Sequence, residues 1–77
     1  MSTLPLHRSG NETYDAHGTD ISHHGLGLTT ECKLERAQVI KLFLSVDHSK
    51  ATLPVLGEVV WAQPINDKVR AGVRFLI

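Results

Sequence analysis

Residues 38–46, in the middle of the chain, alternate between two faces, the outer of which is partly apolar. One face of this stretch carries Ile40, Leu42, Leu44 and Val46, and the other carries Val39, Lys41, Phe43 and Ser45. A period of two residues is that of a β-strand. A helix would place Lys41 in an apolar stripe, and β-branched and aromatic residues favour a strand. We therefore predict a strand here.

Two further stretches show the same alternation. Leu53, Val55, Val59 and Trp61 are in phase over residues 51–63, and Val69, Ala71, Val73, Phe75 and Ile77 share a face over residues 69–77. Pro54 has no amide hydrogen, so we expect it at an edge or at the start of its strand. Gly57 interrupts its run, which predicts a β-bulge or a close approach of the backbone. Turn-forming residues follow the strands at 47–50 and 64–68.

The first part of the chain differs in composition from the rest. It is rich in glycine, proline and small polar residues, and the two-residue period begins at Thr19. We predict a flexible N-terminal arm over residues 1–18, mostly loop but leading into a strand near Tyr14, and a barrel domain over residues 19–77. Short strands separated by turns, with no long helix, predict an all-β antiparallel barrel or sandwich. We favour the barrel because closure removes exposed strand edges.

Composition limits what this domain can do. At 77 residues, folding buries only about 60% of the surface of the extended chain, so we expect one domain with a thin core. Eight acidic residues balance eight basic ones, which gives no overall attraction to nucleic acid or to an anionic membrane. Cys32 is the only cysteine, so no internal disulfide can form, and a lone thiol fits a reducing cytoplasm. No apolar run has the length of a membrane span or a signal peptide.

The sequence DISHHGLGL, residues 20–28, combines turn chemistry with the start of a strand. In one interpretation, Asp20 and Ser22 accept backbone hydrogen bonds in a turn and Gly25 supplies a positive φ. In the other, the Asp20 carboxylate and the Ser22 hydroxyl face a ligand. Gly25 would then let that ligand approach the backbone where a β-carbon would block it. The residues alone leave both interpretations open.

Asp20-x-Ser22-x-x-Gly25 resembles the D/N-x-S-x-x-G signature of PilZ domains, bacterial six-stranded barrels that mostly bind cyclic di-GMP. Residues 56–61, LGEVVW, are similar to the glycine–x–valine–x–tryptophan strand of that family. Residues 71–75, AGVRF, are similar to its closing glycine–valine–x–phenylalanine strand. The resemblance implies a small six-stranded antiparallel barrel in which Asp20, Ser22 and Gly25 contact cyclic di-GMP.

One part of the family pattern is missing. PilZ domains that bind the dinucleotide carry an R-x-x-x-R motif in an arm before the D/N-x-S-x-x-G signature, and its arginines grip phosphates and stack on guanine. Here the arm holds only Arg8. Losing two charge-assisted hydrogen bonds, each worth roughly 1.5–3 kcal/mol, would weaken a micromolar complex to millimolar or beyond. Arg8 replaces one of these contacts if the arm folds back over the barrel.

The histidines do not suggest a metal site or an active site. His23 and His24 are adjacent, so in an extended chain they point to opposite sides, and they lack metal-ligand spacing with Cys32. Asp20, Ser22 and His23 lie too close in sequence to form a base–nucleophile–orienter line. We therefore expect neither a metal site nor an enzyme.

Three larger side chains have a structural and a functional interpretation. Trp61 is in phase with Val59, so we expect it in the core rather than stacked on a ligand. Arg70 and Arg74 are expected on the outer face of their strand as solvated charges. Should they lie near Asp20, they would form a secondary anion site.

Together these observations predict a PilZ-like barrel of the bacterial cytoplasm that binds cyclic di-GMP through Asp20, Ser22, Gly25 and Arg8, without a cofactor. Binding would order the arm and relay occupancy to a protein partner with a motility or biofilm type of output. The alternative is a degenerate adaptor of the same fold that works through protein contacts and does not bind the dinucleotide. A third possibility is a barrel that binds single-stranded nucleic acid, against which neutral charge and 5% aromatic content argue.

Overall fold

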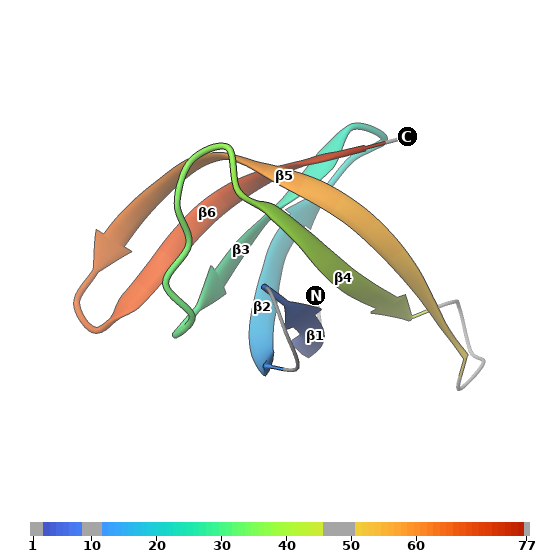
Figure 1. Ribbon diagram of the computed structural model, residues 1–77, viewed down its shortest axis with the longest axis horizontal. Helices are drawn as coiled ribbons and strands as arrows, with labels where there is room; N and C mark the ends of the chain where they lie inside the picture. The colour runs from blue at the N-terminus through green and yellow to red at the C-terminus, as the bar shows by residue number, and fades with distance from the viewer. Residues whose placement is uncertain (1–2, 9–11, 46–50, 77) are drawn as a thin grey trace.

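Six β-strands make up the regular structure of the described residues, which in this computed structural model are 3–8, 12–45 and 51–76 (Figure 1). They are β1 (Thr3–His7), β2 (Thr13–Ile21), β3 (Gly25–Thr30), β4 (Val39–Ser45), β5 (Thr52–Ile65) and β6 (Lys68–Phe75). None of the described segments forms a helix that could cross a membrane.

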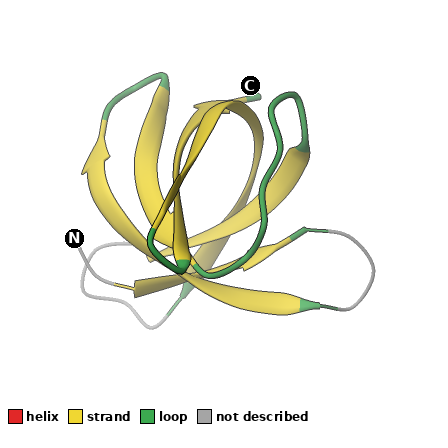
Figure 2. Cartoon of the chain, turned by 90° about the vertical axis from the view of Figure 1, so that its left-hand side faces the viewer, coloured by secondary structure: helices red, strands yellow, loops and turns green. Residues whose placement is uncertain are grey.

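The strands close into an antiparallel barrel in the order β1-β2-β3-β6-β5-β4. Pairing of β1 with β4, at Leu6↔Leu42 and His7↔Lys41, completes the ring. Figure 2 shows the strands curving around a shared interior. The predicted all-β, six-stranded barrel is therefore confirmed.

The core fills this interior with the inward-facing residues of all six strands. In β3 and β4 every second residue is buried over much of the strand, which is the alternation that the sequence predicts for a sheet with one face covered. The largest fully buried side chains are Leu6, Leu28, Ile40, Leu42, Val59 and Cys32. Burial of this single cluster is what holds so small a barrel together.

The predicted boundary between an arm at 1–18 and a barrel at 19–77 is wrong. Within the described residues, β1 and most of β2 lie inside the expected arm, and they pair with each other from Thr3↔His17 to His7↔Thr13. Leu4 and Leu6 are buried in the core. The apolar signal was weak because these leucines flank Pro5 and because β2 turns small residues inward. Ordering of an arm on binding therefore cannot act through these strands, which already belong to the barrel.

The long β5 strand confirms some of the finer predictions and corrects others. Pro54 lies near its start and pairs with Phe43 of β4, whereas pairing with β6 begins only at Gly57. A β-carbon on Gly57 would overlap the Val73 side chain, so the predicted close approach is confirmed. The bulge, however, lies between Val59 and Trp61.

Trp61 is not a core residue, contrary to the prediction. The bulge shifts the phase of β5, so Ala62 takes the inward position against the core and 44% of Trp61 is exposed. The predicted turn at 64–68 is shorter than expected, with β5 ending at Ile65 and β6 starting at Lys68. The turn predicted at 47–50 and the position of Ile77 lie outside the described residues.

Candidate functional site

Four outward-facing residues form one row across neighbouring strands. Asp20 of β2 lies opposite Gly27 of β3, Gly27 lies opposite Gly72 of β6, and Gly72 lies opposite Trp61 of β5. The row thus consists of a carboxylate, two glycines and an indole. Because the glycines have no side chains, the centre of the row is bare backbone between two functional groups.

The carboxylate and the indole both lean over this glycine floor. A β-carbon built on Gly27 would lie 2.5 Å from Oδ1 of Asp20, and one built on Gly72 would overlap Nε1 of Trp61. The Thr19 hydroxyl donates a hydrogen bond of 3.2 Å to Oδ1 of Asp20 and fixes the carboxylate over the floor. Substituting either glycine would therefore displace one wall of the site.

An open pocket of about 380 Å³ lies over the row. Its walls also include Ser22, His24, Val60 and Arg74. Arg74 lies opposite Gly25 in the β3–β6 register and is the only lysine or arginine among the described residues that line the pocket. The pocket therefore combines an acid, a hydroxyl, an aromatic face and one permanent cation.

The loop between β2 and β3 shows what Ser22 does. The Ser22 amide donates a hydrogen bond of 2.9 Å to the Gly25 carbonyl and closes a tight turn. The Ser22 hydroxyl accepts a hydrogen bond of 3.2 Å from the His24 amide. This is the turn chemistry of the first interpretation, and Ser22 performs it while lining the pocket.

Gly25 does not supply a positive φ, which corrects one expectation. It is the first residue of β3 and is in extended backbone. A glycine is needed because a β-carbon here would overlap the Val73 carbonyl oxygen of β6. The residue thus allows the close approach of two strands.

Arg74 has a carboxylate partner on the neighbouring strand. Glu58 of β5 lies opposite it in the β5–β6 register, and Nη2 of Arg74 donates to Oε1 of Glu58 at 2.5 Å. Arg70, the second candidate of this strand, lines a separate hollow with Thr19 and Lys68. The structure therefore places Arg74 in the lining of the same pocket as Asp20 and leaves Arg70 outside that pocket.

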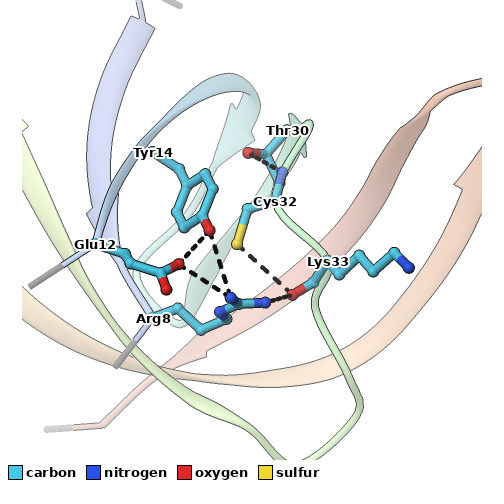
Figure 3. A network of polar contacts seen from close by, with 6 residues as sticks. All are labelled: Arg8, Glu12, Tyr14, Thr30, Cys32 and Lys33. Atoms are coloured by element: carbon cyan, nitrogen blue, oxygen red, sulfur yellow. Dashed lines mark hydrogen bonds and ion pairs between the residues drawn. The ribbon is translucent and has the colours of Figure 1, made fainter. Parts of the chain in front are cut away.

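Arg8 does not line that pocket and takes part instead in a separate polar network (Figure 3). It follows His7, which pairs with Thr13 at the start of β2, whereas Asp20 is near the end of β2. Seven residues of strand at about 3.3 Å each separate Thr13 from Asp20 by roughly 20 Å. The structure therefore does not bring Arg8 together with Asp20.

Three residues around Arg8 form a polar network with it. Its guanidinium donates to the Lys33 carbonyl at 3.2 Å, to Glu12 at 3.1 Å and to the Tyr14 hydroxyl at 3.4 Å. The Tyr14 hydroxyl also donates to Glu12, and this hydrogen bond, followed by the charge of Arg8, lowers the pKa of the Glu12 carboxyl. Cys32 is buried beside the network, and burial raises the pKa of its thiol.

The comparison with known families identifies the family of the chain. The model of the PilZ domain matches residues 1–77, the whole chain. This chain belongs to the PilZ domain family. A search of curated proteins finds no match.

In this PilZ domain, the sequence predicted Asp20, Ser22 and Gly25 as ligand contacts, and the structure places all three in the lining of one pocket. It missed the paired glycines of the floor and assigned Trp61 to the core. Gly27 follows Gly25 by two residues, and that spacing places both glycines on one face of a strand. This spacing was the available signal for the floor, whereas the pairing with Gly72 required the strand register.

Proposed function

We propose that this PilZ domain binds cyclic di-GMP over the floor formed by Gly27 and Gly72. The observation that carries the proposal is the row of Asp20, two glycines and Trp61 beside Arg74. A carboxylate accepts hydrogen bonds from the N–H edge of guanine. An exposed indole offers a face for base stacking, which is worth about 1–3 kcal/mol per base. A guanidinium binds phosphate through paired N–H donors.

The affinity should be lower than that of a site with two arginines. Arg8 belongs to the network around Glu12 and Tyr14, so Arg74 is the guanidinium that the proposal assigns to phosphate. Loss of one charge-assisted contact of about 1.5–3 kcal/mol weakens a micromolar complex by roughly ten- to a hundredfold. We expect a dissociation constant of roughly 10–100 µM. In this proposal the domain acts in the cytoplasm of a bacterium and passes occupancy to a protein partner that controls motility or biofilm formation.

Titration with cyclic di-GMP tests the proposal directly. Trp61 is the only tryptophan of the chain, so its fluorescence reports on the pocket, and calorimetry gives an independent affinity. Asp20→Asn should weaken binding at least about tenfold, because it removes a charged acceptor. Asp15→Asn, at another exposed aspartate of β2, is the matched control and should leave the affinity unchanged. Absence of heat and of a fluorescence change at 1 mM ligand, with folded protein, would refute dinucleotide binding.

An adaptor that works through protein contacts is the second candidate. It is favoured by apolar side chains on the outer surface where β5 begins and β6 ends, of which Leu53 is 55%, Leu56 47% and Leu76 38% exposed. Surfaces of this kind are typical of protein interaction sites. The titration separates the two candidates, because an adaptor keeps its fold and shows no response to the dinucleotide.

A further inference from the structure

We propose that the Glu58 carboxylate competes with the phosphate of the ligand for the Arg74 guanidinium. This competition would set the affinity of the pocket for the ligand. The inference rests on the proposed function, because it concerns the same pocket. It starts from the pairing of the pocket's permanent cation with an acid on the neighbouring strand.

The geometry keeps the two charges together. Glu58 and Arg74 lie directly opposite each other in the β5–β6 register, and their side chains meet at 2.5 Å. Arg74 lines the pocket, whereas Glu58 does not. Arg74 thus lines the pocket while one nitrogen of its guanidinium donates to a group outside it.

A carboxylate and a phosphate require the same donors from a guanidinium. Both are oxyanions that accept its planar, paired N–H groups. Glu58 is fixed on a neighbouring strand, so it acts on Arg74 at the high effective concentration of an intramolecular partner. An incoming phosphate must displace this carboxylate, and the negative charge left nearby also opposes a dianionic ligand.

The side chains are open enough for this exchange to occur. Relative exposure is 57% for Arg74 and 31% for Glu58. The displaced carboxylate can therefore turn into water, and no buried charge is left behind. Exposed ion pairs contribute little to folding. Removing the acid should consequently change binding far more than stability.

The decisive variant is Glu58→Gln, which keeps the shape and one acceptor oxygen of the side chain but removes the charge. We expect it to tighten cyclic di-GMP binding by about three- to tenfold in calorimetry and in Trp61 fluorescence. Glu31→Gln is the matched control, because Glu31 is exposed and follows the far end of β3. Six residues of strand place it roughly 20 Å from Gly25, beyond the screening length of about 8 Å at physiological salt. The Glu31→Gln variant should therefore bind cyclic di-GMP with the same affinity as the parent protein.

Four outcomes decide between the proposals. Tighter binding in Glu58→Gln but not in Glu31→Gln supports the competition between Glu58 and phosphate. Glu58→Thr also removes the charge and suits a strand. It should show the same tighter binding even if Glu58→Gln folds poorly. Unchanged affinity in the folded Glu58 variants overturns the inference and leaves dinucleotide binding in place. Equal tightening in the control also overturns it, because the effect would then be one of net charge. No binding by any folded variant at 1 mM refutes the proposed function and the inference together.

Discussion

At the scale of single residues, two glycines of the pocket are needed for different reasons. A β-carbon on Gly25 would overlap the backbone carbonyl of Val73, which is fixed in the β3–β6 ladder. A β-carbon on Gly72 would overlap the Trp61 indole, a side chain that is partly exposed and able to turn away. The first glycine therefore serves the strand packing, and the second serves the shape of the site.

This difference predicts that alanine substitutions at the two positions will have different effects on stability and on Trp61. Gly25→Ala should lower the free energy of unfolding by about 1–3 kcal/mol, the usual cost of forcing a methyl group against fixed backbone. Gly72→Ala should cost less than about 1 kcal/mol, yet it should shift the emission of Trp61 by moving the indole off the floor. Urea unfolding followed by circular dichroism gives both stabilities. A larger loss of stability in Gly72→Ala than in Gly25→Ala would contradict this assignment.

At the scale of strands, both walls of the site come directly after an irregularity in strand pairing. The register of β2 shifts between Gly18 and Asp20, and that of β5 shifts between Val59 and Trp61. Bulges change the direction in which the following side chains point. These two irregularities place the carboxylate and the indole on the outer surface of the barrel, in the same row.

The same irregularities explain how far the sequence alone could lead. Regular alternation predicted β4, β5 and β6, and turn chemistry with family resemblance predicted the closed barrel and the Asp20 turn. A bulge inverts the phase of a strand without a clear signal in composition, so alternation assigned Trp61 to the core. The β1 strand was missed because a proline separates its two buried leucines. The glycine floor depends on register between strands far apart in the sequence, which alternation within one strand does not contain.

Arg8 directly follows β1, and its guanidinium donates to the Lys33 carbonyl in the segment after β3. This contact predicts a structural rather than a ligand-binding role for Arg8. Arg8 and the thiol of Cys32 both donate to the Lys33 carbonyl, at 3.2 and 3.6 Å. Arg8→Gln should loosen the segment after β3 and raise the rate of Cys32 labelling by about threefold or more. Its affinity for cyclic di-GMP should stay within about twofold of the parent value, because the pocket lies at the other end of β2.

Arg36→Gln is the matched control for this experiment. Arg36 is an exposed arginine of the turn before β4, so its loss changes net charge equally. Labelling of Cys32 by a thiol reagent should be unchanged in this variant. A large loss of dinucleotide affinity in Arg8→Gln, without one in Arg36→Gln, would return Arg8 to the ligand site.

At the scale of the whole molecule, one small core must supply the stability. A chain of this length has a free energy of unfolding of about 4–12 kcal/mol, and its single cysteine permits no internal disulfide. A change in the protonation of a single group can therefore alter a noticeable fraction of the free energy of unfolding. Burial raises the pKa of the Cys32 thiol, and the hydrogen bond to Glu12, followed by burial, raises that of Tyr14. The pKa of Glu12 is lowered by its hydrogen bond from Tyr14 and by the charge of Arg8.

These directions predict a plateau of stability with a fall on each side. Glu12 favours folding above its unfolded pKa of about 4.3, and its contribution disappears as the pH falls through its lowered folded pKa. Cys32 and Tyr14 act in the opposite sense. Their contributions are complete below unfolded pKa values of about 8.5 and 10, and they are lost as the pH rises through the raised folded values. The urea midpoint should thus be nearly constant between roughly pH 5 and 8.

Cys32→Ala isolates the first step of the alkaline fall. In the parent protein the folded state holds the thiol proton more tightly than the unfolded state does, so stability should begin to decrease above about pH 8.5. The variant has a lower midpoint throughout, because a buried sulfur is lost. Its midpoint should nevertheless stay level until Tyr14 begins to ionise near pH 10. Urea titrations at half-unit steps from pH 7 to 11 measure both slopes, and equal slopes between pH 8.5 and 10 would show that the thiol is not the group responsible.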